Sequence, residues 1–302
     1  DVGYQEGTTL TKIGDSELNI TNSNRACYSV NFCGSAFTPD FTGSSSTGSL
    51  LIDPNVTNFN EGANIVNNTS TAPTNITSKK ITVASGKNFN YEGTTAPLNI
   101  LLKEQGATCA GCAFFDVVTG TFITTNNSTS TVSITDVGGN DGYVHIGGDY
   151  THTSTVTNTD KGSHSVNVFG KIDVDGTTLL TAVNDPVSFT SRSSWIQFGT
   201  TSANTFTFTG TNSGTGIGLL DILASGNCAG TTCADPGGFV LFTGNVSTTN
   251  ETTGTVSIKS EKHYVQMDEK FEHTGVTGDM LTSGHTSVNI GNLVDIKRNG
   301  IG

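Results

Sequence analysis

Apolar and polar residues alternate in short runs along most of the chain. In the segment from Val166 to Val174, for example, valine and isoleucine are separated by polar partners around Phe169-Gly170. A period of two predicts β-strands that bury one face, and no useful length of the chain shows the helical period. Thr-Gly, Gly-Gly and Asn-Gly pairs interrupt the runs and favour tight turns. We therefore predict an all-β protein.

The same short segments recur along the chain. Leu18-Asn19-Ile20, Leu98-Asn99-Ile100 and Leu220-Asp221-Ile222 each precede a pair of cysteines, and residues 120–126 and 131–134 match 244–250 and 255–258 without a gap. Recurrence of this kind is typical of repeat architectures. We interpret it as three β modules, residues 1–90, 91–207 and 208–302, with extra strands at about 177–207 in the second.

Two architectures fit an elongated three-module repeat of this pattern. The strands could be rungs of a parallel β-helix (a β-solenoid), in which Gly and Asn turn the corners. They could instead be hairpins of tandem antiparallel β-sandwich modules. We prefer the β-helix, because each coil contacts only its neighbours and the extra strands at about 177–207 insert easily.

The six cysteines fall in three close pairs. They are Cys27 with Cys33, Cys109 with Cys112, and Cys228 with Cys233. An even number in such a chain favours local disulfides in an oxidising compartment. Metal binding or a redox role through Cys109-Ala110-Gly111-Cys112 is the alternative, although the other two pairs lack a regular metal-ligand spacing.

Charge restricts the partners that the chain can have. Fourteen Lys and Arg stand against 26 Asp and Glu, which gives a net charge of −12. Nucleic acids and anionic lipid surfaces need clustered basic residues, so we expect neither as a partner. No apolar run reaches the length of a membrane span, and the start of the chain is typical of a mature protein after removal of a leader.

The style of the repeats resembles a known class of secreted proteins. Ile81-Thr82-Val83-Ala84-Ser85-Gly86-Lys87-Asn88-Phe89-Asn90 and the segment from Val166 to Gly176 resemble β-helix adhesins of the filamentous-haemagglutinin type. The low charge and the abundance of Thr and Asn also resemble subunits of extracellular filaments and surface layers. This resemblance implies an extracellular or cell-surface location, with adhesion or assembly as the function, surface glycans as possible partners, and no catalysis.

Histidines and acidic residues are the candidates for metal binding and for acid–base catalysis. Only His152 and His273 occupy equivalent positions in two modules, each near an acid, which suggests a metal or acid–base pair or else a polar position on the outer face of a strand. Asp173 and Asp175 lie on one strand face, about 6.5–7 Å apart by the strand rise. They are the acids available for carbohydrate cleavage. The alternative functions are therefore a secreted β-helix protein that binds or cleaves carbohydrate, or a monomeric adhesin fragment. No catalytic motif is present, so we predict a protein that is not an enzyme.

The sequence offers one weak candidate for a cation site and several candidate glycosylation sites. The acidic, Gly-rich loop with Asp136, Asn140 and Asp141 offers oxygen ligands for Ca²⁺ or is a plain turn; we otherwise predict no cofactor and no metal. Nine N-x-Ser/Thr sequons are candidate glycosylation sites, of which Asn126 and Asn250 fall at equivalent positions where we expect a glycan to face solvent. The sequons begin at Asn19, Asn55, Asn67, Asn68, Asn75, Asn126, Asn127, Asn245 and Asn250.

The two ends of the chain indicate assembly. The segment from Tyr4 to Thr9 resembles Tyr91 to Thr95, and the segment from Asp295 to Gly300 resembles Asp173 to Gly176. Repeat stacks without polar caps expose strand edges that invite another chain. We therefore expect a structural subunit that joins copies of itself head to tail in an extracellular filament or surface layer. The residues expected at this joint are Asp1, Val2, Gly3, Tyr4, Leu10, Ile296 and Ile301.

Overall fold

The computed structural model describes part of the chain, in the following segments. These are residues 18–21, 29–32, 50–53, 56–67, 71–103, 113–126, 130–136, 142–154, 163–183, 185–211, 219–226, 238–251, 255–275, 280–284, 287–290 and 294–298. Within these segments the protein is all-β and contains no helix, which confirms the predicted fold class. The described part therefore also holds no helix that could span a membrane.

The strands form three long sheets, and successive strands pass from the first sheet to the second and then to the third. The first sheet contains, in order, β1 (Leu18–Thr21), β3 (Leu50–Asp53), β6 (Thr74–Ser78), β9 (Leu98–Leu102), β12 (Thr131–Asp136), β15 (Ser163–Val168), β18 (Pro186–Ser191), β21 (Leu219–Ala224), β24 (Val256–Ser260) and β27 (Met280–Gly284). The second contains β2 (Ser29–Phe32), β4 (Val56–Phe59), β7 (Lys80–Val83), β10 (Phe114–Val117), β13 (Tyr143–Ile146), β16 (Ile172–Val174), β19 (Ile196–Phe198), β22 (Val240–Phe242), β25 (Tyr264–Met267) and β28 (Ser287–Ile290). The third contains β5 (Ala63–Asn67), β8 (Phe89–Gly93), β11 (Phe122–Asn126), β14 (Tyr150–Ser154), β17 (Thr178–Val183), β20 (Thr205–Thr211), β23 (Asn245–Asn250), β26 (Phe271–Gly275) and β29 (Val294–Arg298).

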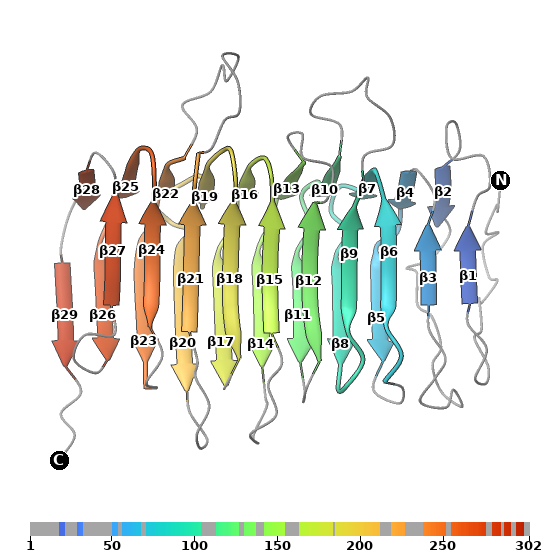
Figure 1. The fold of residues 1–302 in the computed structure, drawn as a ribbon, viewed down its shortest axis with the longest axis horizontal. Helices are drawn as coiled ribbons and strands as arrows, with labels where there is room; N and C mark the ends of the chain where they lie inside the picture. Colours follow the sequence, from blue (N-terminus) through green and yellow to red (C-terminus); the bar gives the residue numbers. More distant parts are fainter. Residues whose placement is uncertain are drawn as a thin grey trace.

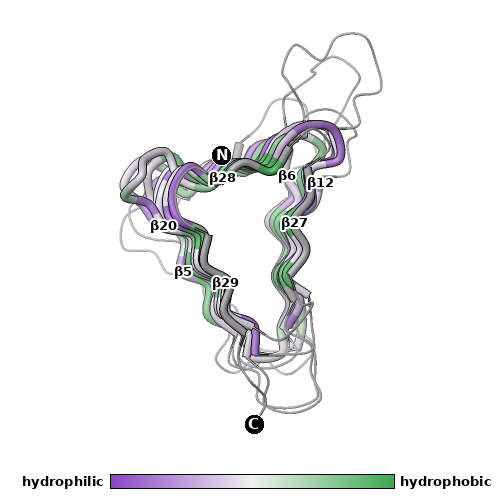
Figure 2. Tube along the Cα trace, turned by 90° about the vertical axis from the view of Figure 1, so that its left-hand side faces the viewer, coloured by the Kyte–Doolittle hydropathy of each residue, from purple (hydrophilic) through white to green (hydrophobic). Residues whose placement is uncertain are grey.

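Neighbouring strands in each sheet come from successive passes of the chain and run parallel. In the second sheet, for example, β10 pairs with β7 on one side and with β13 on the other, both parallel. Figure 1 shows the strands of each sheet following one another along the length of the molecule, and Figure 2 shows that the three sheets enclose one triangular interior. The arrangement is consistent with a β-helix. Tandem antiparallel sandwiches do not fit, because every strand pair in the described residues is parallel.

The alternation in the sequence places every second side chain inside. Strand β12 shows this pattern, because Val132 and Ile134 are buried and their polar neighbours are half-buried on the outer surface. The pattern repeats coil after coil, since parallel register keeps an inward residue beside an inward residue of the next strand. Val132, for example, pairs with Leu98, and both are fully buried.

Aromatic rings make one continuous core through the middle coils. Phe89 lies 5.7 Å from Phe115, which lies 5.3 Å from Phe122, and Phe122 stacks on Tyr150 at 5.3 Å. Tyr150 in turn meets Phe189 edge to face at 5.7 Å. Large rings that contact the coils above and below bury much apolar surface, and they hold successive coils together.

Glycine is required where the chain turns close against the coil before it. A Cβ atom at Gly120 would lie 1.6 Å from the carbonyl oxygen of Lys87, and one at Gly244 would lie 1.6 Å from that of Asn204. No side chain fits such a contact, since real Cβ atoms essentially never approach within 3.0 Å. These two glycines begin the matching segments 120–126 and 244–250, so part of the sequence repeat reflects close coil stacking.

The predicted modules lie within uninterrupted sheets. The boundary at 90/91 falls inside β8 and the boundary at 207/208 falls inside β20. The extra segment at about 177–207 contributes β17, β18, β19 and the start of β20, which continue all three sheets. The division of the chain into three modules stays a prediction.

Candidate functional site

A row of acidic and histidine side chains lies on the outer face of the second sheet. Register pairs Asp116 of β10 with His145 of β13, and His145 with Asp173 of β16. Each residue stands between two buried apolar residues of its strand, as His145 does between Val144 and Ile146, so its side chain points outward and is half-buried. Asp175 follows directly after β16 and joins the same group.

Carboxylates surround the His145 imidazole. Nδ1 lies 2.8 Å from Oδ1 of Asp116, and Nε2 lies 3.3 Å from Oδ2 of Asp175. The hydrogen bond to Asp116 raises the pKa of His145 above its ordinary value; burial opposes this shift, and Asp175 adds to it. Lys171 donates to Oδ2 of Asp173 at 3.0 Å. We call His145, Asp116, Asp173 and Asp175 the outer acidic cluster.

A second row on the same face consists of stacked aromatic rings with Lys171 between two groups of them. Phe114 stacks on Tyr143 at 5.2 Å, Trp195 stacks on Phe239 at 5.5 Å, and Phe239 stacks on Tyr264 at 5.4 Å. Lys171 fills the gap, with its Nζ 5.7 Å from the Tyr143 ring and 5.0 Å from the Trp195 ring. The rings face one another along the row, so they present their edges outward and contribute mainly to cohesion between coils.

The equivalent histidines lie inside the molecule. His152 is 0 % exposed and His273 is 2 % exposed, so the interpretation that they occupy outer strand faces is wrong. His152 stands two residues after the buried Tyr150, and the period of two therefore places both on the same face. Each imidazole Nδ1 bonds the threonine of the preceding coil: Thr124 to His152 at 2.9 Å, and Thr248 to His273 at 2.8 Å.

A third buried histidine completes an interior polar group. His164 stacks on His152, with ring centroids 4.3 Å apart, and Nε2 of His164 is hydrogen-bonded to the Tyr150 hydroxyl. Nε2 of His152 and Nδ1 of His164 have no hydrogen-bond partner among the described residues. Burial lowers the pKa of His152 to about 3, and burial, followed by the neighbouring His152, holds the pKa of His164 well below its ordinary value.

The structure places several sequons inside the core. Asn67, Asn126 and Asn250 are all 0 % exposed, and Asn67 donates from Nδ2 to the carbonyl oxygen of Ala72 at 3.2 Å. The expectation that a glycan at Asn126 or Asn250 faces solvent is therefore wrong, because each is the inward residue that ends its strand. Asn245 is exposed at the start of β23, and Asn75 is half-buried on the first sheet.

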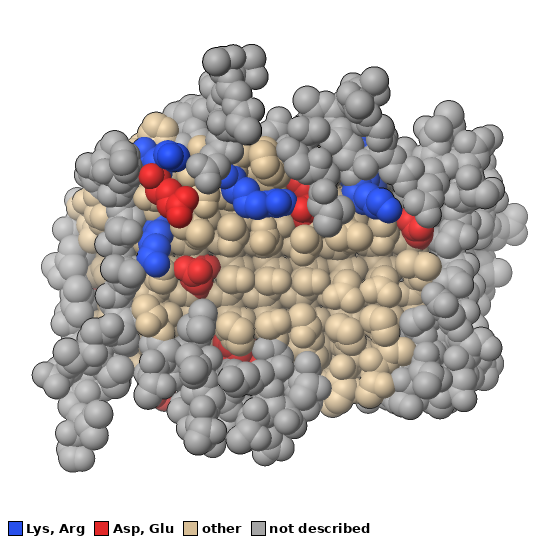
Figure 3. Space-filling view, viewed as in Figure 1, with Lys and Arg blue, Asp and Glu red and all other residues tan. Residues whose placement is uncertain are grey.

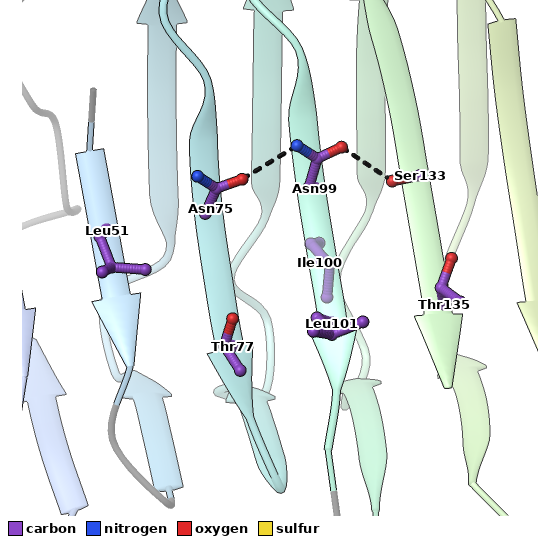
Figure 4. A pocket seen from close by; sticks show the side chains of 8 residues that line it. All are labelled: Leu51, Asn75, Thr77, Asn99, Ile100, Leu101, Ser133 and Thr135. Carbon is purple, nitrogen blue, oxygen red and sulfur yellow. Dashed lines mark hydrogen bonds between the residues drawn. The ribbon is translucent and has the colours of Figure 1, made fainter. Parts of the chain in front are cut away.

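Asn75 lies in a shallow depression on the outer face of the first sheet. The depression has a volume of about 490 Å³, and its lining includes Asn75, Asn99 and Ser133. Figure 4 shows these side chains in one row, in which Asn99 donates to Asn75 at 2.9 Å and Ser133 donates to Asn99 at 3.0 Å. These two hydrogen bonds link the row, and Figure 3 shows that the surrounding surface carries few charges.

Other predicted site residues are only partly described. Asp136 of the calcium-loop candidate is 1 % exposed, and its Oδ2 accepts the Phe169 amide at 3.3 Å; Asn140 and Asp141 lie outside the described residues. All six cysteines, together with Asn55, Asn68 and Asn127, lie outside them too. So do Asp1, Val2, Gly3, Tyr4, Leu10 and Ile301, whereas Asn19 and Ile296 are described as backbone within β1 and β29.

The sequence alone singled out Asp173 and Asp175 as a pair of acids on one strand face, and it gave no reason to join them with His145 and Asp116. The sequence pattern that these residues share is a polar residue between two apolar residues, in strands that lie next to each other in the fold. Phe115-Asp116-Val117, Val144-His145-Ile146 and Ile172-Asp173-Val174 share this form. Comparison with known proteins adds no relative, because no family model, no curated protein and no solved structure matches the chain.

Proposed function

We propose that the chain is a structural subunit of an extracellular assembly, built as a β-helix that extends by end-to-end contact between copies. Its form supports this role. The three sheets share one continuous core, and the described part of that core is largely aliphatic and aromatic. Parallel coils of this kind stack into a stiff rod, and a strand edge that no further coil covers offers hydrogen-bonding groups to another chain.

Val288 is the observation that carries the proposal. It pairs with Val265, which is 0 % exposed in the core, so Val288 stands at an inward position of the last described coil of the second sheet. Its side chain is nevertheless 40 % exposed. An inward valine that the described coils leave partly exposed offers an apolar contact to one more coil. A second copy could supply that coil in parallel register, and such a head-to-tail contact grows an open filament when its rotation does not close.

Replacement of Val288 by aspartate should block this contact, because it places a charge where the next coil must pack. We expect light scattering of the intact protein to rise with concentration, and scattering of the Val288→Asp variant to stay at the monomer value. Leu179→Asp is the matched control, since Leu179 is 43 % exposed but lies on the outer face of the third sheet. It should assemble like the intact protein.

Circular dichroism should show the same β content in all three proteins. An intact chain that stays monomeric at high concentration would disprove the proposal. Assembly of the Val288→Asp variant to the same extent as the intact chain would place the contact elsewhere and also contradict it.

A further inference from the structure

The outer acidic cluster brings three potential metal ligands together. One ligand atom each from His145, Asp173 and Asp175 lie within 4.8 Å of one another. Zinc binds imidazole nitrogen and carboxylate oxygen at about 2.0–2.2 Å, so ligands of one ion lie about 4 Å apart or less. Modest rotation of the side chains would bring the three ligand atoms from within 4.8 Å of one another to within about 4 Å. The backbone already holds the residues in place, because His145 and Asp173 are register partners in adjacent strands.

The hydrogen bonds of His145 require a positive species beside Nε2. A neutral imidazole has a single N–H, and the shorter contact, from Nδ1 to Asp116 at 2.8 Å, accounts for it. Nε2 then directs a lone pair at Oδ2 of Asp175, 3.3 Å away, which is also an acceptor. Two acceptors face each other favourably only when a proton or a cation lies between them. A second proton on the imidazole or a bound cation fills the position beside Nε2, and the metal titration below distinguishes the two.

The charge around this position is negative on balance. Asp116, Asp173 and Asp175 are the three acids, and Lys171 is the one cation that contacts them among the described residues. The next residue along the row, Gln197, is neutral. The Asp173 side chain is only 13 % exposed, so solvent screens this cluster less than it screens fully exposed acids.

We propose that the outer acidic cluster binds a divalent transition-metal ion of the zinc type through Nε2 of His145 and one carboxylate oxygen each of Asp173 and Asp175. An imidazole with two carboxylates suits Zn²⁺ and its neighbours, whereas Ca²⁺ requires six to eight oxygen ligands. Asp116 acts as a positioning residue. Its hydrogen bond to Nδ1 fixes the ring and directs Nε2 at the metal, as carboxylates commonly do for zinc-bound histidines.

Calorimetric titration of the full chain with ZnCl₂ tests the proposal. The intact protein should bind Zn²⁺ at this site, and NMR should show the ring signals of His145 shifting during the titration. His145→Ala should abolish that binding event, and Asp175→Asn should weaken it. Asp116→Asn should weaken it by about 10–100-fold, the usual effect of removing an outer partner of a metal-bound histidine. Asp221→Asn is the matched control, because it removes one half-buried acid from the outer face of the first sheet, and it should bind as the intact protein does.

Two results would overturn the proposal. One is that His145→Ala binds Zn²⁺ as the intact protein does and that the His145 ring signals of the intact protein do not shift. This result would place the ion at other residues. The other is equal displacement of Zn²⁺ by CaCl₂ at equal concentration, which would contradict the nitrogen ligand. All substitutions lie on the outer surface, so thermal melts that match the intact protein should confirm that loss of binding is not loss of fold.

Discussion

The free energy of unfolding should fall steeply as the pH drops below about 6.5, because two buried histidines cannot accept protons while the chain stays folded. Burial lowers the pKa of His152 from 6.5 to about 3, and the pKa of His164 is also held well below 6.5. The two rings stack on each other at 4.3 Å, so a charge on one also opposes a charge on the other.

The sign of this pH effect on stability follows from the number of protons that the folded and the unfolded chain each bind. Above pH 6.5 both histidines are neutral whether the chain is folded or unfolded, and their contribution to stability is fully present. Below 6.5 the unfolded chain binds protons that the folded chain does not, so stability is lost as the pH falls toward the folded pKa of about 3 for His152. Each histidine then contributes about 1.4 kcal/mol per pH unit, or about 2.7 kcal/mol per unit for the pair.

Urea unfolding at several pH values between 7.5 and 4.5 measures this loss. The double variant His152→Leu, His164→Phe should lose much less stability over that range than the intact protein. All other titratable groups are the same in both proteins, so the difference between the two slopes is the relevant quantity. Equal slopes would show that neither histidine is held neutral. The pKa of His145 is shifted upward, so that residue acts in the opposite direction, and it is present in both proteins.

Two adjacent phenylalanines should differ greatly in their effect on stability. Phe115 is 0 % exposed and contacts Phe89 and Phe122 in the core, whereas Phe114 points outward and stacks on Tyr143. Phe115→Ala should cost about 3–5 kcal/mol, because it removes core contacts and leaves a cavity. Phe114→Ala should cost about 0.5–1.5 kcal/mol, the usual contribution of one aromatic pair.

Chemical denaturation of the two variants and the intact protein provides the comparison. Both substitutions remove the same atoms from neighbouring positions of β10, so a change in strand propensity cannot explain a difference in their loss of stability. A smaller loss for Phe115→Ala than for Phe114→Ala would mean that the strand faces the other way and that the register is wrong.

The sequence predicted the fold class well because alternation is a local property. A run such as Val166 to Val174 shows which residues share a face, and the structure buries the apolar set. Alternation alone could not separate a β-helix from sandwiches, because both have one buried face per strand. That choice depends on which strands pair, and the pairs join residues far apart in the chain.

The site was harder to predict for the same reason. Asp116 and Asp175 contact His145 from positions 29 and 30 residues away, and loops of unequal length between coils hide the spacing. His152 was assigned to the wrong face because a polar residue was assumed to lie outside. His152 lies two residues after the inward-facing Tyr150, so the alternation of the strand places it inside as well. The threonine of the preceding coil forms a hydrogen bond with the buried ring and so makes this position tolerable.

The central claim is that successive strands stack in parallel register along one axis, and distances between spin labels test it most directly. Val66, Thr181 and Thr274 lie in one outward row of the third sheet, with Thr181 four strands and Thr274 seven strands from Val66. Labels attached by chemistry that does not use cysteine should therefore give separations of about 19 Å for Val66 with Thr181 and about 34 Å for Val66 with Thr274, in proportion to the strand spacing of about 4.8 Å. Separations that do not grow in proportion to the number of strands would contradict the stacked-coil structure.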